Sequence, residues 1–541
     1  MNDRSIRTVG RNLATAFSVV VLFVASLAPG LIDSGSALAL VRVPLEAMIA
    51  LLVLAILPWR AARRVIAVLF GVLFVSATVG AALDRAFTVT VGQPFNVVTG
   101  WPELVDGYGV VRDSLGSFAA GAILVLLGLV TLASILLIAW SLLHLDRIVR
   151  LHRRAAAIGT AAITASWVVL ALVAVQLVPG EPVAASDAIS SVESRVAQAN
   201  AAARDQAAFD RQRAIDPYSV VPASQLLTGL KGKDVILVFV ESYGQVAVQN
   251  TSFSPGVDQV LRQGNAQLAA SGYSERSAFL TSSTYGGISW LAHSTLQTGL
   301  WIDSQQTYDK VTSGNRLTLS DAFRNAGWRT MSDVPSDTRP WAIGSKFYHF
   351  GTELNSLNVG YQGPKFSYAR VPDQYTLAYF QQHELSQPHK PLMAEIDLVS
   401  SHNPWTPLPH LVPWTSIGDG SVFDPQPAQG QSPAVVWQDP TQVQKVYGES
   451  IQYTMGALFS FLTTFDDPNL VMVVLGDHQP AAVVSGTGSN HDVPISIISK
   501  DTGVIDRISG WNWQPGMLPS PSAPIWRMDA FRNRFLSAYS R

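Results

Sequence analysis

The first third of the chain consists of long apolar runs separated by short polar segments. Five of these runs approach the ~20 residues that a helix needs to cross a bilayer. Four of them contain no Asp, Glu, Lys or Arg, and the second contains Arg42 and Glu46. The pattern predicts an α-helical membrane domain of five transmembrane helices within residues 1–180. The runs are Leu13–Leu31, Leu38–Leu57, Val65–Leu83, Phe118–Trp140 and Ala156–Val178.

Basic residues are concentrated in every second loop between these runs. Arginines cluster before the first run, between the second and third, and between the fourth and fifth, whereas the other two loops carry few. Such clusters lie in the cytoplasm by the positive-inside rule. We therefore expect a multi-pass protein of the cell (inner) membrane with a cytoplasmic N-terminus and a C-terminal domain outside the cytoplasm, either periplasmic or at the outer face. The arginines are Arg4, Arg7, Arg11, Arg60, Arg63, Arg64, Arg147, Arg150, Arg153 and Arg154.

The two ionisable groups in the second run are a candidate functional feature, because charges inside a membrane span are often functional. Arg42 and Glu46 are one helical turn apart, so an ion pair near the outer end of the span is the simpler interpretation. A proton or ion relay would usually contain more such groups. We favour the ion pair, and we expect the membrane domain to act as an anchor.

The pattern changes after residue 233, where the apolar runs become short and rich in β-formers. Such runs suit strands that are buried on both faces of a sheet, and helical patterns over 318–327 and 444–465 separate them. Residues 233–541 are therefore predicted to form an α/β domain with a central, mostly parallel sheet. Residues 181–232 are predicted to be a solvated juxtamembrane connector with helical propensity, and residues 404–442 a long surface excursion. The four expected strands are Val235–Val240, Pro391–Val399, Leu470–Leu475 and Pro494–Ser499.

Composition agrees with this division of the chain. Of 541 residues, 14% are charged, whereas an ordinary soluble protein has about 25%. The formal net charge of −2 gives no indication of nucleic-acid binding. Cysteine is absent, which excludes disulfides, thiolate metal sites and a cysteine nucleophile. The absence of thiols does not fix the compartment.

Polar residues with metal-binding groups stand at the ends of the expected strands. Glu241 follows the first strand, His402 the second and Asp477-His478 the third, while His491 precedes the fourth. In open α/β sheets the ligand site lies off the carboxyl ends of the strands. Each residue alone could be a helix cap or a turn former. Their recurrence at one edge favours a site for Zn²⁺ or Mn²⁺, which bind such oxygen and nitrogen ligands.

The segment "TYGGISWLAHSTLQTG", Thr284–Gly299, carries more hydroxyl groups than a core-packing helix needs. Gly286 and Gly287 would let the backbone approach a ligand closely. Ser289 would then fall in the first turn of a helix, where the free N–H groups favour an anion. A divalent metal would activate its hydroxyl. Together with Glu241 and the Asp-His pair, this serine suggests metal-assisted ester transfer through a covalent serine intermediate.

The segments "DVILVFVES", "GGISWLAHSTLQTG", "SHNPW" and "VMVVLGDHQP" resemble the alkaline phosphatase and sulfatase superfamily. They are most similar to its membrane-anchored phosphotransferases, the lipoteichoic acid synthases and phosphoethanolamine transferases, which typically have five transmembrane helices and an extracytoplasmic catalytic domain. When the Thr-Gly that ends the sulfatase motif is aligned with Thr298-Gly299, the nucleophile of the motif falls on Ser289. Thr284 is the second candidate nucleophile. The Pro and Arg of that motif fall on Leu291 and His293, so the resemblance argues against a sulfatase.

The resemblance also implies roles for individual residues. Glu241, Ser289, Asp477 and His478 would bind the metal, and Ser289 would be the catalytic nucleophile. The resemblance implies substrate contacts for five further residues. Two of these, His402 and His491, could instead hold a second metal. Trp341 could equally be packed under a loop. The five residues are His402, His491, His293, Arg339 and Trp341.

These observations predict a metal-dependent, membrane-anchored transferase. It would move phosphoglycerol or phosphoethanolamine from a phospholipid donor to a cell-envelope glycan or polymer through a phosphoserine intermediate. The absence of cysteine favours the glycerophosphate-transferring group, because lipid A phosphoethanolamine transferases usually have disulfides. One alternative is a hydrolase of the same superfamily: a phosphodiesterase, a phosphatase or a sulfatase. Another is a catalytically silent envelope sensor or scaffold, which the set of candidate ligands speaks against.

Overall fold

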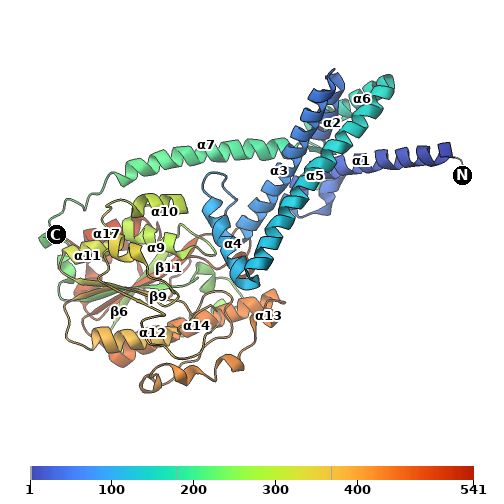
Figure 1. The fold of residues 1–541 in the computed structure, drawn as a ribbon. Helices are drawn as coiled ribbons and strands as arrows, with labels where there is room; N and C mark the ends of the chain where they lie inside the picture. The colour runs from blue at the N-terminus through green and yellow to red at the C-terminus, as the bar shows by residue number, and fades with distance from the viewer. Residues whose placement is uncertain (1–2, 179–180, 367) are drawn as a thin grey trace. The chain divides into compact units, whose positions relative to one another are not determined.

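The computed structural model describes residues 3–178, 181–366 and 368–541 (Figure 1). It divides into two compact units. The first comprises Met1–Thr88 and Gln93–Arg204, and the second comprises Val89–Gly92 and Asp205–Arg541. The second unit thus includes the end of the predicted connector in addition to the predicted α/β domain.

The first unit is helical, and three of its helices are long and apolar enough to cross a membrane. Their apolar parts, Val9–Ser34, Arg60–Val91 and Ser117–Leu151, include the first, third and fourth predicted spans. The other two predicted spans contain shorter apolar helices, Leu45–Ile56 and Ala162–Leu172, so the count of five remains a prediction. The helices are α1 (Asp3–Ser34), α2 (Leu45–Ile56), α3 (Arg60–Val91), α4 (Trp101–Leu115), α5 (Ser117–Leu151), α6 (Arg153–Leu172) and α7 (Asp187–Arg213).

The second predicted span does not begin as an α-helix. A 3-10 turn at Ala37–Val41 and a short strand at Val43–Pro44 come first, and α2 starts only after Pro44. Proline lacks a backbone N–H and suits the start of a helix better than its interior, so it sets this boundary. The side chains of Arg4, Arg7 and Arg153, which contributed to the predicted topology, lie outside the described part of the chain.

The two charged side chains of the second run, Arg42 and Glu46, bind the N-terminal end of α7. The Arg42 guanidinium donates to both carboxylate oxygens of Asp187, at 2.9 and 3.1 Å, and to the carbonyl of Pro182. Glu46 accepts hydrogen bonds from the backbone N–H groups of Ala188 and Ile189, at 2.9 and 3.3 Å. A carboxylate at these N–H groups caps the helix favourably. The contacts favour a structural role for both groups over a relay.

The second unit is built on a nine-stranded sheet in the order β12-β6-β11-β10-β5-β9-β7-β8, with β13 also paired to β6. The strands from β10 to β8 are mutually parallel, and β11 is antiparallel to both of its neighbours. The predicted mostly parallel sheet is therefore confirmed, and β5, β9, β10 and β11 are the four expected strands. The strands are β5 (Asp234–Val240), β6 (Ser274–Thr281), β7 (Arg329–Val334), β8 (Thr352–Asn355), β9 (Leu392–Leu398), β10 (Leu470–Gly476), β11 (Asp492–Ser499), β12 (Gln514–Pro515) and β13 (Ile525–Arg527).

Helices cover both faces of this sheet, which explains why its central strands are apolar throughout. Figure 1 shows α9 and α14 on opposite sides of the sheet. Alternate residues of β5 enter two separate cores: Leu237 and Phe239 belong to the core that includes α9, and Ile236 and Val238 to the core that includes α14. The predicted helices over 318–327 and 444–465 are confirmed as α11 and α14. The helices are α8 (Ser254–Ala270), α9 (Ser289–Thr298), α10 (Gln305–Thr312), α11 (Leu319–Asn325), α12 (Asp373–Phe380), α13 (Pro433–Val436), α14 (Pro440–Phe465), α15 (Ala482–Ser485), α16 (Thr502–Asp506) and α17 (Ala530–Tyr539).

The predicted surface excursion at residues 404–442 is partly buried. Its helical parts are three 3-10 turns, the short α13 and the first residues of α14. Trp405, Phe423 and Val436 have at most 1% of their surface exposed and belong to the core on the α14 side. The segment therefore packs on the sheet domain instead of projecting from it, because its large apolar side chains need burial.

Asp333, in β7, is a buried carboxyl group whose charge destabilises the fold. It is 1% exposed, and neither oxygen has a hydrogen-bond partner among the described residues. Burial, and then the charge of Glu384, raise its pKa to about 7. The unfolded chain loses this proton near pH 4, so the protein loses stability as the pH rises from about 4 to 7.

Asp333→Asn is accordingly expected to stabilise the protein at pH 8, by about 3–4 kcal/mol, and much less at pH 5. Asparagine has a similar shape and does not titrate. Thermal melts of the full chain in detergent at both pH values measure the effect. The exposed Asp506→Asn serves as the matched control, and an equal melting-temperature gain at pH 5 and pH 8 would contradict the assignment.

Candidate active site

The sheet topology brings the predicted site residues to one edge. Strands β5 and β10 are parallel and in register, with Val240 beside Gly476, so Glu241 and Asp477 follow neighbouring strand ends. Strand β11 runs the opposite way, with Ile495 beside Leu475. Its amino end therefore lies at the edge where β10 has its carboxyl end. This reversal explains why His491 precedes its strand in the sequence.

A close backbone approach fixes the Asp-His pair. A Cβ atom on Gly476 would lie 1.9 Å from the carbonyl oxygen of Tyr243, so only glycine lets the turn after β5 reach the end of β10. Asp477 Oδ1 then accepts hydrogen bonds from the backbone N–H groups of Ser242, at 2.8 Å, and His478, at 2.7 Å. The other oxygen, Oδ2, is buried and has no hydrogen-bond partner among the described residues.

The glycine-rich loop before α9 positions Ser289 next to the Asp-His pair. Gly286 has a φ of 69° and Ile288 a φ of 63°. Both values lie in the left-handed region, so the backbone turns sharply before α9. The N–H of Gly286 donates to the carbonyl of Gln479 at 2.9 Å, which ties the loop to the segment after the Asp-His pair. Helix α9 begins at Ser289, so the serine lies in the first turn, as predicted.

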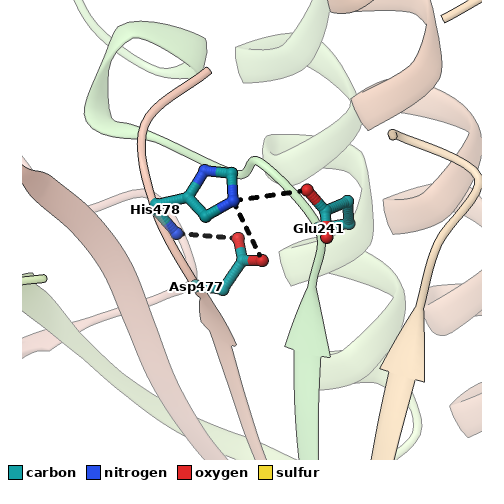
Figure 2. A group of neighbouring side chains, drawn as sticks. All are labelled: Glu241, Asp477 and His478. Carbon is teal, nitrogen blue, oxygen red and sulfur yellow. Dashed lines mark hydrogen bonds and ion pairs between the residues drawn. The ribbon is translucent and has the colours of Figure 1, made fainter. Parts of the chain in front are cut away.

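Three of the four predicted metal ligands, Glu241, Asp477 and His478, converge on one point (Figure 2), and the fourth, Ser289, contacts two of them. Ser289 Oγ donates to Glu241 Oε2 at 3.1 Å and lies 3.2 Å from His478 Nε2. That imidazole nitrogen is 3.4 Å from Glu241 Oε1 and 3.5 Å from Asp477 Oδ2. These last separations are long for hydrogen bonds. They suit ligand atoms arranged around one cation, and the unpartnered Asp477 Oδ2 also fits a metal ligand.

The electrostatics of the cluster also fit a divalent cation. Burial alone would raise the pKa of Glu241, but the charges of His402 and His478 and the hydrogen bond from Ser242 hold it below its ordinary value. Burial and the charge of Glu241 raise the pKa of Asp477. Two carboxylates thus compete for limited positive charge in a buried site. A bound Zn²⁺ or Mn²⁺ would let both ionise.

His402 and His491 lie around this cluster without joining it. His402 stacks on the Tyr368 ring, with centroids 3.6 Å apart, and its charge acts on Glu241. The His491 ring lies 5.5 Å from that of Tyr285. Within the described part of the chain, neither imidazole has a hydrogen bond to the four ligands. Their placement is compatible with contacts to a substrate.

The remaining predicted contacts have different surroundings. Trp341 packs against Tyr348 and Phe350, with ring centroids 5.2 and 6.3 Å apart, which favours the packing alternative. Arg339 is exposed, and in the described chain it makes no ion pair with the cluster. His293 points to a second acidic group: its Nδ1 atom is 3.3 Å from Glu395 and 3.6 Å from Asp397.

Sequence reasoning missed Glu395 and Asp397, because they lie inside a run that was interpreted as continuously apolar. Both are in β9, two residues apart, so their side chains are on the same face of the sheet. That face packs against α9, where neighbouring positions such as Met393 and Phe239 are apolar. The sequence did contain a signal for this site: two carboxylates, two residues apart, inside a strand expected to be buried, where unpaired charges are unfavourable.

Two arginines fix the C-terminal end of α9. The carbonyl of Thr298 accepts hydrogen bonds from Arg316 Nε at 3.0 Å and Arg532 Nη1 at 3.1 Å. Both guanidinium groups bind the carboxylate of Asp216, at 3.2 and 2.8 Å. All three side chains are at least 91% buried. Positive charge at a helix C-terminus is favourable, so these contacts stabilise the helix that carries Ser289.

Asp216→Ala is expected to destabilise the second unit by about 3–5 kcal/mol, because it leaves two buried guanidinium groups side by side. Burial already lowers the pKa of Arg316 to about 10, with a further contribution from Arg532. Thermal melts followed by tryptophan fluorescence measure the effect. Asp210→Ala, at a site with 45% of the side chain exposed, is the control, and equal melting temperatures for the two variants would contradict the role.

No family model and no curated protein matches this chain. Solved structures do show similarity. The integral membrane protein lipooligosaccharide phosphoethanolamine transferase A (EptA) from Neisseria meningitidis is 14% identical, with a TM-score of 0.45, over 96% of this chain and 94% of its own. The lipoteichoic acid synthase LtaP from Listeria monocytogenes is 13% identical, with a TM-score of 0.34, over 50% of this chain and 66% of its own. The Streptococcus pyogenes phosphoglycerol transferase GacH, solved with sn-glycerol-1-phosphate, is 13% identical, with a TM-score of 0.36, over 58% of this chain and 87% of its own.

Proposed function

We propose that this chain is a metal-dependent phosphotransferase of the alkaline phosphatase and sulfatase superfamily, anchored in a membrane by its N-terminal helices. One observation carries the proposal: a serine hydroxyl at the start of a helix lies within 3.2 Å of both a carboxylate and an imidazole. Within residues 3–178, 181–366 and 368–541, the buried Asp477 Oδ2 atom next to them has no hydrogen-bond partner. The motifs around these residues support the same assignment.

The proposed reaction has two transfers at phosphorus. Ser289 Oγ, whose proton is directed at Glu241 Oε2, attacks the phosphorus of the donor and gives up that proton. The bond from phosphorus to the lipid oxygen breaks, and the lipid alcohol leaves with one proton. A divalent cation held by Glu241, Ser289, Asp477 and His478 would lower the pKa of the hydroxyl and stabilise charge on the phosphoryl oxygens. The free N–H groups of the first turn of α9 favour the same charge. An acceptor hydroxyl then displaces Ser289 and releases the product.

We infer that the donor is a phospholipid and that the transferred group is phosphoglycerol or phosphoethanolamine. Three helices long and apolar enough to cross a membrane support access to a lipid substrate. An envelope glycan or polymer is the proposed acceptor. The absence of cysteine in the chain favours phosphoglycerol. His402 and His491 are proposed to contact the phosphoryl group, because a histidine can donate a hydrogen bond to it.

Mass spectrometry of the full chain in detergent tests this proposal. After exposure to phosphatidylglycerol or phosphatidylethanolamine, a mass matching the donor's phospho-alcohol is expected on Ser289. Incubation with and without acceptor glycan then distinguishes a transferase from a hydrolase, since only the transferase needs the glycan to turn over. Modification of another residue, or of none with any phospholipid, would refute the proposed intermediate.

The proposed topology makes a separate prediction. With a cytoplasmic N-terminus and five spans, the C-terminus lies outside the cytoplasm. A reporter that is active only outside the cytoplasm, fused after Arg541, is therefore expected to be active. A reporter that is active only inside serves as the control. Activity of the inside reporter alone would show an even number of spans and would contradict an extracytoplasmic site.

A further inference from the structure

A second set of metal-ligating side chains lies on the α9-facing surface of β9. It consists of His293, on α9, and the carboxylates Glu395 and Asp397, on β9. The three are only slightly exposed, with between 6% and 16% of each side chain accessible. The first metal cluster does not use them. A buried group of this composition needs a cation or protons, because unpaired carboxylates are unfavourable in a low-dielectric interior.

His293 Nδ1 makes one long hydrogen bond within this set, to Glu395 Oε1, and none to Asp397, and these separations also suit ligands of a shared cation. His293 Nδ1 lies 3.3 Å from Glu395 Oε1 and 3.6 Å from Asp397 Oδ1. A hydrogen bond does not reach 3.6 Å. Two ligands of a tetrahedral Zn²⁺, each at about 2.0–2.1 Å, lie about 3.4 Å apart. The Asp397 Oδ1 atom is also buried and has no hydrogen-bond partner in the described chain.

Neighbouring side chains hold two of the three groups in these orientations. Gln297 donates from its Nε2 atom to Glu395 Oε2, and its own Oε1 atom accepts from the backbone N–H of Ser320 at 2.9 Å. The His293 ring is stacked on Phe239, with centroids 3.7 Å apart and planes 10° from parallel. Metal sites commonly have such outer partners, which fix the direction of the ligand atoms. The ligand atoms of the three residues lie within 4.8 Å of one another.

The carboxylates of this set lie near those of the first cluster and act on them electrostatically. Burial raises the pKa of Asp397 well above its ordinary value, His293 opposes this, and the carboxylates of Glu395, Asp477 and Glu241 raise it further. The two clusters are thus close enough for their carboxylates to repel one another. A second positive ion between His293 and the β9 carboxylates would remove this repulsion.

We propose that His293, Glu395 and Asp397 bind a second divalent cation, so that the site is binuclear. One nitrogen and two carboxylate ligands favour Zn²⁺ or Mn²⁺. This inference rests on the proposed function and deepens it. His293 follows Ser289 by four residues on α9, so the second cation lies on the same side of the helix, about 6 Å further along. Three protein ligands leave a coordination position for a substrate oxygen.

Metal content of the full chain in detergent tests the proposal. The protein is stripped with a chelator, titrated with ZnCl₂ or MnCl₂, desalted and analysed by inductively coupled plasma mass spectrometry. Two ions per chain are expected for the wild type. Asp397→Asn, which preserves shape and removes a charged ligand, is expected to bind one, and Glu241→Gln to bind one. The exposed Asp506→Asn is the control and should retain two.

The outcomes separate this inference from the proposed function. A single ion in the wild type that Glu241→Gln loses and Asp397→Asn retains would overturn the second site and leave the first intact; His293 would then be a protonated bridge between the carboxylates. Two ions in Asp397→Asn would also overturn it. A single ion lost only in Asp397→Asn would support the second site and refute the first. If circular dichroism shows that Asp397→Asn does not fold, His293→Gln takes its place with the same expectations.

Discussion

Ser289→Ala is expected to reduce headgroup transfer by about 10⁴-fold or more, which is the scale seen when a catalytic nucleophile is removed. The structure places this hydroxyl at the N-terminus of α9, directed at Glu241 Oε2 and close to His478. Alanine leaves the helix and the three other ligands in place. The measurement is transfer of labelled phosphoglycerol or phosphoethanolamine from lipid to acceptor, together with loss of the covalent adduct.

Two companion variants make this result specific. Ser289→Thr retains a hydroxyl at the same position and is expected to keep most of the activity. Thr284→Ala removes the second candidate nucleophile, which is buried with its Oγ1 atom 3.5 Å from Ser282 Oγ, and is expected to keep activity within about tenfold. An active Ser289→Ala protein with an inactive Thr284→Ala protein would assign the covalent step to Thr284.

Asp477→Asn is expected to lose the first cation and to lower the rate by about 10³-fold or more, on the scale of a lost transition-state contact. The amide can keep the acceptor role of Oδ1 toward Ser242 and His478. It cannot reproduce the charge of the unpartnered Oδ2. Chelation of the wild-type protein is expected to have the same effect, reversed by Zn²⁺ or Mn²⁺.

Metal content and transfer rate measured on the same samples distinguish this effect from misfolding. The exposed Asp309→Asn is a suitable control, since it makes the same chemical change away from the site. Full activity of the wild-type protein in the presence of a chelator that removes all bound metal would show that the reaction does not depend on the cation. The roles assigned to Glu241 and His478 would then also be withdrawn.

The parts of the fold that the sequence predicts are those in which one local pattern determines the structure. Strands β5, β9, β10 and β11 are buried on both faces, and their apolar runs are recognisable without knowledge of their neighbours. Strand β6, "SERSAFLT", has no such run and is a strand because β11 and β13 pair with it. In the membrane unit the hydropathy of residues 38–57 is high, but Pro44 delays the helix.

The same distinction applies to the site. The convergence of Glu241, Asp477 and His478 follows from one rule about strand ends in α/β sheets. Which face of β9 meets α9 depends on tertiary packing, so the partnership of His293 with two carboxylates of that strand could not be predicted. The packing of Trp341 among aromatic residues is also a tertiary property, and the sequence left it open.

The contacts of Arg316 and Arg532 with the Thr298 carbonyl affect where the chain can be truncated to give a soluble fragment. A fragment beginning at Lys233 would contain the whole sheet and every candidate ligand, yet it would lack Asp216. Arg316 and Arg532 would then meet at the Thr298 carbonyl without their carboxylate. A fragment that begins at Asp205, where the longer segment of the second unit starts, retains it. The smallest piece that contains all the catalytic chemistry is therefore not the smallest piece expected to stay folded.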